Sequence, residues 1–161
     1  MPVIEDRILI EFARFSDAAE ISVMSKNDIE YGLGWKYTLE RIAKLIGDRS
    51  RNVVVARVGP HLAGFGIMTY CEDQANLDLL AVKRSFRRMR IGTRIVEWLE
   101  KVALTAGAFN IFVQVRARNT SAIQFYKSVG FSVLDEDKAY YRGIEAGLIM
   151  AKSLRRMFNA T

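Results

Sequence analysis

The residues best suited to chemistry in this chain lie between Val82 and Gly92, where five basic side chains and one glycine follow a mostly apolar stretch. That stretch, Leu77–Val82, is typical of a strand, and an amphipathic pattern typical of a helix begins at Ile91. The first turn of a helix leaves backbone N–H groups without intrahelical partners at the positive end of the helix dipole. Arginine adds forked donors that suit phosphate oxygens. The junction therefore predicts a phosphate-binding turn, with an ordinary solvated basic surface as the alternative.

The net charge of +6 and the pI near 9.6 favour an anionic partner, whether nucleic acid, a membrane surface or a phosphorylated small molecule. Lys83–Arg94 holds six cationic residues and no acid, and Lys152, Arg155 and Arg156 form a second group. Neither group is interleaved with the aromatic residues that a single-strand binding platform needs, and no helix-turn-helix or zinc-finger pattern occurs. No apolar run approaches the roughly 20 residues that span a bilayer. We therefore expect neither nucleic acid nor a membrane as a partner.

Length and composition indicate one globular domain over residues 1–161, with 50% hydrophobic and 26% charged residues. Residues 1–7 lack the layout of a secretory signal, which favours a cytoplasmic location. The single cysteine, Cys71, has no partner for an internal disulfide, and with the single histidine, His61, it makes no metal-ligand cluster. We expect no metal, and we interpret Cys71 as a packing residue rather than a nucleophile.

The remaining pattern alternates segments typical of strands and helices, with no repeat or linker between them. Polar caps and glycine stops mark the helices: Ser16 or Asp17 begins the first, Thr38 the second, and Asn119 or Thr120 the last. The expected strands cover residues 7–15, 53–58, 62–70, 77–82 and 111–115, with two more within 133–150; the expected helices cover about 19–29, 39–46, 91–106 and 120–129. Strand, helix and strand in succession over residues 77–115 require a right-handed parallel crossover. The sequence thus predicts an α/β or α+β fold with a partly parallel, mixed sheet.

Two motifs make the reading more specific. The first is Arg-Arg-Met-Arg-Ile-Gly at residues 87–92, which opens the amphipathic helix. The second runs from Val113 to Phe131 and contains Asn119 and the pair Phe125-Tyr126. Their order and spacing resemble the GNAT superfamily of acetyl-CoA-dependent N-acetyltransferases. Residues 140–150 are also similar to the bacterial members that acetylate the N-terminal amine of a ribosomal protein. The resemblance is strong over residues 75–152, while over residues 7–70 it rests on the order of elements.

The resemblance implies the GNAT fold, a mixed and mostly antiparallel sheet of about seven strands with a central parallel pair and about four helices. It implies acetyl-CoA as co-substrate, with its pyrophosphate wrapped by the amides of the basic turn and its pantetheine arm paired with the preceding strand. The cofactor-binding residues implied in this way are Leu80, Ala81, Val82, Arg87, Arg88, Met89, Arg90, Ile91, Gly92, Thr93, Asn119 and Tyr126. From the residues alone, Asn119 is equally a helix cap, and Tyr126 is a core aromatic. Under the resemblance, Tyr126 is catalytic and protonates the departing CoA sulfur.

Three positions depart from the family pattern. Arg84 stands where proline is common, and Arg90 stands where the first glycine of the loop is usual. Either the backbone at Arg90 adopts a conformation open to other residues, or its amide lies less close to phosphate. Gln114 replaces a glutamate that serves as general base in the ribosomal-protein group, and a carboxamide cannot accept a proton at neutral pH.

A base matters because only a neutral amine attacks a thioester. A lysine amine has a pKa of about 10.4 and an N-terminal amine a pKa of about 8. At neutral pH a larger fraction of the N-terminal amine is therefore already deprotonated, and it depends less on a catalytic base. Asp78 is our candidate catalytic base because it is in phase with Leu80 and Val82 on a mostly apolar strand; Glu72 and Asp73 are the next candidates, and a solvent-facing or ion-paired role for Asp78 is the alternative.

The expected reaction is direct attack of an acceptor amine on acetyl-CoA, without a covalent enzyme intermediate. By analogy with the family, the acceptor lies between Tyr31–Trp35 and Tyr140–Glu145. A small molecule or a protein N-terminus can serve as acceptor, and the chain can be a monomer or a homodimer. A non-catalytic acyl-CoA sensor of the same fold is the alternative function, and a basic nucleic-acid binder is a third.

Overall fold

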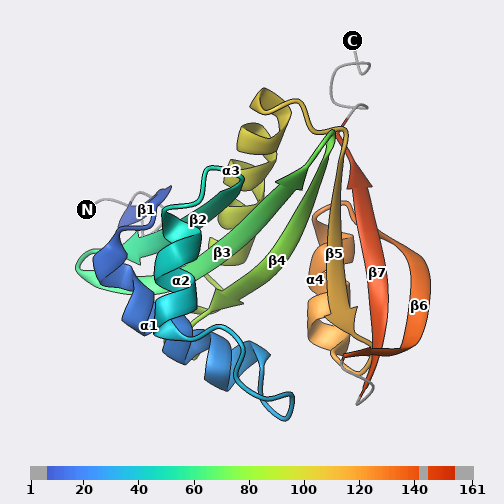
Figure 1. Cartoon of the computed structure of the whole chain (residues 1–161), viewed down its shortest axis with the longest axis horizontal. Coiled ribbons are helices and arrows are strands. Elements are labelled where there is room, and N and C mark those ends of the chain that lie inside the picture. The colour runs from blue at the N-terminus through green and yellow to red at the C-terminus, as the bar shows by residue number, and fades with distance from the viewer. Residues whose placement is uncertain (1–6, 142–144, 155–161) are drawn as a thin grey trace. The chain divides into compact units, whose positions relative to one another are not determined.

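The computed structural model describes residues 7–141 and 145–154 (Figure 1). The strands are β1 (Ile8–Phe12), β2 (Arg51–Val58), β3 (His61–Cys71), β4 (Gln74–Val82), β5 (Asn110–Arg116), β6 (Ser132–Tyr141) and β7 (Glu145–Ser153). The α-helices are α1 (Ala18–Met24), α2 (Leu39–Ile46), α3 (Ile91–Thr105) and α4 (Thr120–Ser128). Short 3-10 turns occupy Phe15–Asp17 and Arg84–Phe86, and a π-helical turn occupies Ser25–Ile29.

The strands form one mixed sheet in the order β1-β2-β3-β4-β5-β7-β6. β4 and β5 run parallel, whereas β1–β2, β2–β3, β5–β7 and β6–β7 are antiparallel pairs. The parallel pair is connected through α3, as the strand-helix-strand succession predicts. The predicted fold class, with its seven strands, central parallel pair and four helices, is confirmed. The parallel ladder pairs Gln74–Leu77 with Asn110–Val113, so the second half of β4 lies beyond it.

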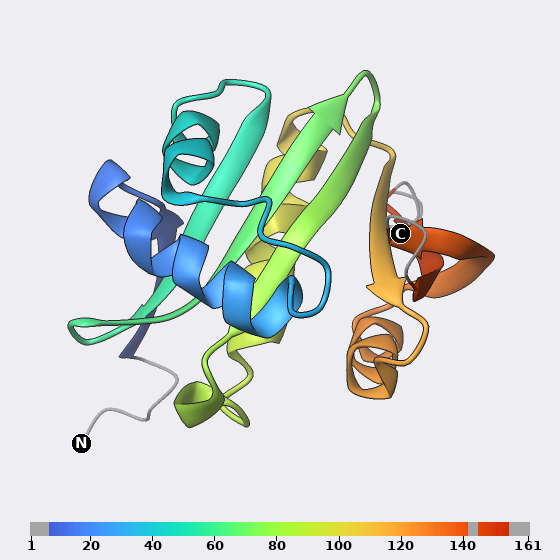
Figure 2. The same ribbon diagram turned by 60° about the horizontal axis from the view of Figure 1, so that its bottom comes forward.

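The chain divides into two compact units. Unit 1 contains Met1–Thr69 and Leu79–Leu99, and unit 2 contains Tyr70–Asp78 and Glu100–Thr161. In unit 1, α1 and α2 cover one face of the strands and the first part of α3 covers the other (Figure 2). β3 carries small residues where α3 approaches it: a Cβ built on Gly66 would lie 3.1 Å from both Ile95 and Leu99.

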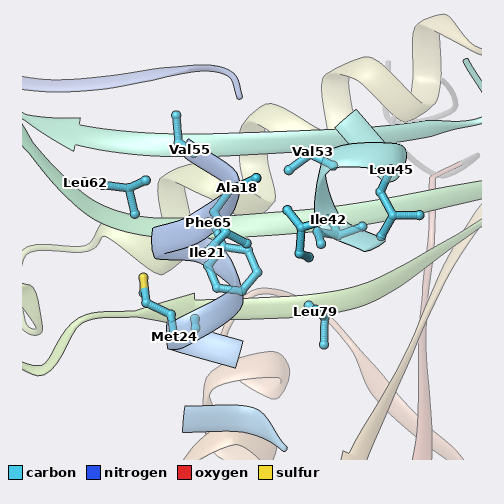
Figure 3. Close-up of a cluster of buried hydrophobic side chains, with 12 residues drawn as sticks. Ala18, Ile21, Met24, Ile42, Leu45, Val53, Val55, Leu62, Phe65 and Leu79 are labelled. Carbon is cyan, nitrogen blue, oxygen red and sulfur yellow. The ribbon is translucent and has the colours of Figure 1, made fainter. Parts of the chain in front are cut away.

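The core of unit 1 lies beneath α1 and α2 (Figure 3). Ile21 of α1 and Ile42 of α2 are fully buried there against Phe65 of β3. Hydrophobic burial of this kind contributes about 25 cal/mol per Å² of apolar surface, so these side chains fix both helices on the sheet. Thr38 begins α2 as predicted, because its hydroxyl accepts a hydrogen bond from the Arg41 amide at 3.4 Å.

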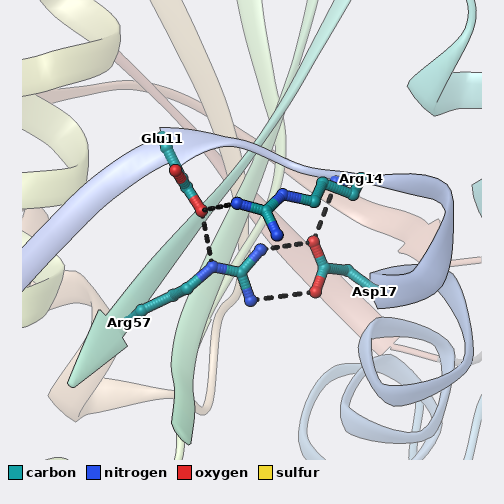
Figure 4. Close-up of polar contacts among 4 residues, drawn as sticks. All are labelled: Glu11, Arg14, Asp17 and Arg57. Atoms are coloured by element: carbon teal, nitrogen blue, oxygen red, sulfur yellow. Dashed lines mark hydrogen bonds and ion pairs between the residues drawn. The ribbon is translucent and has the colours of Figure 1, made fainter. Parts of the chain in front are cut away.

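The first predicted helix is wrong in detail. Residues 19–29 do not form one continuous α-helix, because α1 ends at Met24 and a π-helical turn follows. Neither predicted cap, Ser16 or Asp17, caps α1 with its side chain. The Asp17 carboxylate instead accepts from the Arg14 amide at 2.8 Å and from the Arg57 guanidinium at 3.0 and 2.7 Å (Figure 4). A partner on β2, distant in the sequence, therefore outcompetes the local cap.

In unit 2, the end of α4 is held by Lys152 of β7. Its ammonium donates to Glu100 Oε1 of α3 and to the carbonyl of Val129, each at 2.8 Å. Asn119 begins α4 by accepting from the Ala122 amide at 3.1 Å, which confirms the first of the two predicted caps. Gly130 ends the helix with a φ of 101°, where a side chain is strained.

Candidate active site

The turn before α3 has an unusual backbone. Arg88 and Arg90 have φ of 67° and 60°, in the left-handed region that favours glycine, while Met89 between them does not. Left-handed residues within a turn can direct successive N–H groups toward one side, which is how anion-binding concavities form. The sequence left open whether Arg90 adopts a glycine-like conformation, and the structure shows that it does.

The amides of this turn are available to a ligand. α3 begins after Arg90, whose carbonyl accepts the first helical hydrogen bond from the Arg94 amide at 3.1 Å. Within the described part of the chain, no backbone carbonyl accepts from the amides of residues 88–93. Ile91 is 1% exposed and anchors the turn in the core, while Arg87, Arg88 and Arg90 are exposed. The turn thus combines donor groups on the main chain with exposed positive side chains around them.

The strand that leads into the turn, β4, has two different faces. Ala75, Leu77, Leu79 and Ala81 are buried, while Asn76, Asp78, Leu80 and Val82 alternate with them on a half-buried face. Asp78 therefore shares a face with Leu80 and Val82, as its phase in the sequence predicts. The Ala81 side chain points into the core, so only its main chain is available for binding. Glu72 and Asp73 are exposed in the turn before β4, at the opposite end of the strand from Val82.

Unit 2 contains Asp78 of β4 and further predicted residues on β5 and at α4. Tyr126 is 6% exposed, and its ring makes edge-to-face contacts with Phe125 and Phe131 at centroid distances of 5.2 and 5.4 Å. The carboxamide of Asn119 caps α4, which is the alternative role that the residue pattern allowed. Gln114 is half-buried on β5. The structure places Asn119 and Tyr126 in unit 2, and it places the basic turn with Leu80–Val82 in unit 1.

No helix within residues 7–141 and 145–154 is both long and apolar enough to cross a bilayer. The same residues gather no group of three or more histidine, cysteine, aspartate or glutamate side chains around a possible metal position.

Comparison with known proteins decides the family. The sequence model of the Acetyltransferase (GNAT) family matches residues 17–131, which span both units. The chain belongs to the GNAT family. The chain is 32% identical over 108 residues to a ribosomal protein bS18-alanine N-acetyltransferase of Salmonella typhimurium, covering 65% of this chain and 72% of that protein. It is also 37% identical over 73 residues to N-alpha-acetyltransferase 50 of Danio rerio, covering 44% of each. This GNAT protein is therefore an acetyl-CoA-dependent N-acetyltransferase.

Solved structures show the same GNAT fold. Ard1 from Thermoplasma volcanium superposes with a TM-score of 0.81 at 22% identity, covering 91% of this chain and 97% of that one. The paia N-acetyltransferase from Thermoplasma acidophilum, in complex with coenzyme A, gives a TM-score of 0.76 at 23% identity and covers 91% and 98%.

Sequence reasoning missed two features of this GNAT protein. The left-handed backbone at Arg88 carries no mark in the sequence, because glycine is the residue that such a conformation suggests. The second is the buried position of Glu30, which no pattern in the sequence indicates. Glu30 is 6% exposed, and loop amides surround its carboxylate, so Asp28 is the exposed acid of that segment. Of the other predicted acceptor segment, Tyr140–Glu145, residues 142–144 lie outside the described residues.

Proposed function

We propose that this enzyme acetylates the N-terminal amine of a polypeptide by direct attack on acetyl-CoA. The relatives support this acceptor, since their names specify the alanine of ribosomal protein bS18 and the α-amino group. The ribosomal acceptor of the first relative also supports a cytoplasmic location. Charge supports the same class: Lys26 and Lys36 are exposed beside Tyr31–Trp35, and Asp28 is the exposed acid nearby. A polyamine or aminoglycoside would meet repulsion at such a surface rather than acidic lining.

The observation that carries the proposal is the pair of left-handed arginines before α3. We propose that the amides of residues 88–93 hold the pyrophosphate of acetyl-CoA, with the α3 dipole favouring its charge. Arg87, Arg88 and Arg90 add long-range attraction. The main chain of Leu80–Val82, beyond the ladder with β5, is proposed to hydrogen bond with the pantetheine arm. Asn119 is proposed to contact the same arm.

The proposed chemistry has one transfer step. The neutral amine nitrogen attacks the thioester carbonyl carbon, and a main-chain N–H of β4 is proposed to stabilise the oxyanion. The C–S bond then breaks as the C–N bond becomes an amide. The amine proton passes to Asp78, directly or through water, and Tyr126 gives its phenolic proton to the CoA sulfur. The Tyr126 ring is buried and contacts Phe125 and Phe131 edge to face, which holds the side chain in place.

Three measurements test this function. Calorimetry with acetyl-CoA should give a micromolar-range Kd, weakened by salt because phosphate contacts are charged. Peptides with a free N-terminus should produce free thiol faster than the same peptides with a blocked N-terminus. Tyr126→Phe should lower thiol release about 10²-fold, a much larger factor than any change in the Kd for acetyl-CoA. Tyr70→Phe, the same loss of a hydroxyl on β3, is the matched control. Equal rates for free and blocked peptides would exclude the N-terminal acceptor, and full activity of Tyr126→Phe would exclude its role as acid.

A further inference from the structure

The segment between the π-helical turn and α2 is built around one buried carboxylate. Glu30 Oε1 accepts from the Lys36 amide at 2.7 Å, and Oε2 accepts from the Tyr37 amide at 3.2 Å and from Ser25 Oγ at 3.1 Å. The Glu30 amide donates to the Ser25 carbonyl at 2.7 Å, and its carbonyl accepts from the Leu33 amide at 3.0 Å. Glu30 therefore joins the beginning of the segment to its end.

Within residues 31–35, held in this way, exposed and buried side chains alternate. Leu33 is 8% exposed, whereas Tyr31 and Trp35 are 55% and 43% exposed. Gly32 and Gly34 separate them with φ of 76° and 85°, which only glycine adopts without strain. Tyr31 and Trp35 together form an exposed surface, which we call the aromatic surface. Glu30 and the buried Leu33 hold the loop that carries it. Exposure of two aromatic rings to water is unfavourable, and these exposed rings do not contribute to the core of unit 1.

The hydrogen-bonding pattern requires a carboxylate at position 30. Both oxygens accept from N–H or O–H donors, and two of these donors are backbone amides that cannot reverse their direction. A glutamine offers one oxygen acceptor and one NH₂ donor, so one amide of the loop would face a donor. Burial makes that mismatch costly, because neither group can turn to water.

We propose that Glu30 is a positioning residue for the acceptor: it holds Tyr31 and Trp35 in the arrangement that receives the acceptor peptide. This inference rests on the proposed function, in which residues 31–35 flank the acceptor. Glu30 does not touch the reacting atoms, and the acetyl-CoA contacts proposed above do not involve it. Loss of the carboxylate should therefore raise the KM for the acceptor while leaving acetyl-CoA binding unchanged.

The test compares Glu30→Gln with Glu40→Gln, the same chemical change at an exposed glutamate of α2. For Glu30→Gln, the KM of the peptide acceptor should rise about tenfold, the cost of one mispaired buried hydrogen bond. The Kd of acetyl-CoA by calorimetry should stay the same, and Glu40→Gln should leave both quantities unchanged. Ser25→Ala removes one donor and should raise KM less than Glu30→Gln. An unchanged acceptor KM in folded Glu30→Gln overturns the inference.

Hydrogen exchange provides a readout that does not depend on turnover. In the wild type, the Lys36 and Tyr37 amides should exchange far more slowly than in an open chain, and Glu30→Gln should accelerate both. Should that variant fail to fold, rapid exchange of these two amides in the wild type still overturns the inference. Absence of turnover with every amine, by contrast, contradicts the proposed function itself and with it the acceptor role. Turnover that Glu30→Gln leaves unaffected overturns this inference alone.

Discussion

The guanidinium of Arg57 meets the carboxylate of Asp17 edge to edge, with Nη1–Oδ1 and Nη2–Oδ2 distances of 3.0 and 2.7 Å. Arg57 also donates to Glu11 Oε1 at 2.6 Å, so β1, β2 and the start of α1 share one ion-pair network (Figure 4). Asp17 is 8% exposed, so its charge depends on these partners rather than on water. The network therefore fixes the beginning of α1 on unit 1.

Asp17→Asn should destabilise the protein by about 2–4 kcal/mol at pH 7, because it removes a buried charge from its partner. Burial raises the pKa of Asp17, but hydrogen bonds from Arg57 and the Arg14 amide lower it more, and the net pKa lies below 3.8. The folded pKa is thus depressed. The contribution is fully present above the unfolded pKa and is lost as pH falls through the folded pKa. Urea unfolding across this acid range should show the two proteins converging, whereas Asp28→Asn, at an exposed position, should match the wild type throughout.

Arg90→Gly and Arg90→Ala separate backbone strain from side-chain charge. At an ordinary position alanine is more stabilising than glycine, but at a φ of 60° the order should reverse by about 1 kcal/mol. Both variants lose the same charge, so their affinities for coenzyme A should fall by similar factors. Urea unfolding and calorimetry measure the two quantities. An alanine variant at least as stable as the glycine variant would contradict the left-handed conformation.

Gly130→Ala should cost about 2–3 kcal/mol, because φ is 101° and a Cβ would lie 2.9 Å from Lys152 Cε. Lys152 cannot easily withdraw, since its ammonium is bound to Glu100 and to the Val129 carbonyl. In a Lys152→Ala background the same substitution should therefore cost about 1 kcal/mol less. Gly107→Ala is the matched control, with a φ of 89° and no atom within 4 Å of the new Cβ. Strict additivity of the two substitutions would show that Lys152 does not restrict position 130.

Asp78→Asn should affect acceptors according to their basicity. An alkylamine with a pKa of about 10.4 is almost fully protonated at pH 7.5 and needs a base, so its rate should fall about 10²-fold. A peptide N-terminus with a pKa of about 8 should lose less, and its loss should shrink as pH rises. Asp73→Asn, at the far end of β4, should change neither rate. Equal loss for both amines would assign Asp78 a structural role instead.

Local signals in the sequence were sufficient for much of the fold. Thr38 and Asn119 are caps whose partners lie three residues away, and the parallel pairing of β4 with β5 follows from the crossover that α3 makes. The beginning and the end of α1 could not be predicted in the same way. Asp17 has its main partner, Arg57, 40 residues further along the chain, and the π-helical turn that follows α1 carries no composition of its own.

The candidate site, like the fold, was only partly predictable from the sequence. The basic turn before α3 was evident because charge and helix periodicity are visible in the letters. Glu30 was not predicted, because an acidic residue in a loop is usually solvated and two of its partners are backbone amides, which every residue except proline has. The role of Glu30 therefore depends on the folded conformation of the loop and cannot be recognised from the sequence.

The two left-handed arginines before α3 also bear on how such chains are found. A search that recognises this loop by its glycines passes over a protein in which arginine adopts the required backbone angles. Because the proposed donors belong to the main chain, the side chains at positions 88 and 90 would tune the affinity for an anion rather than create the site. Among distant GNAT proteins, the backbone torsion angles of this loop are therefore a better basis for comparison than its residue types.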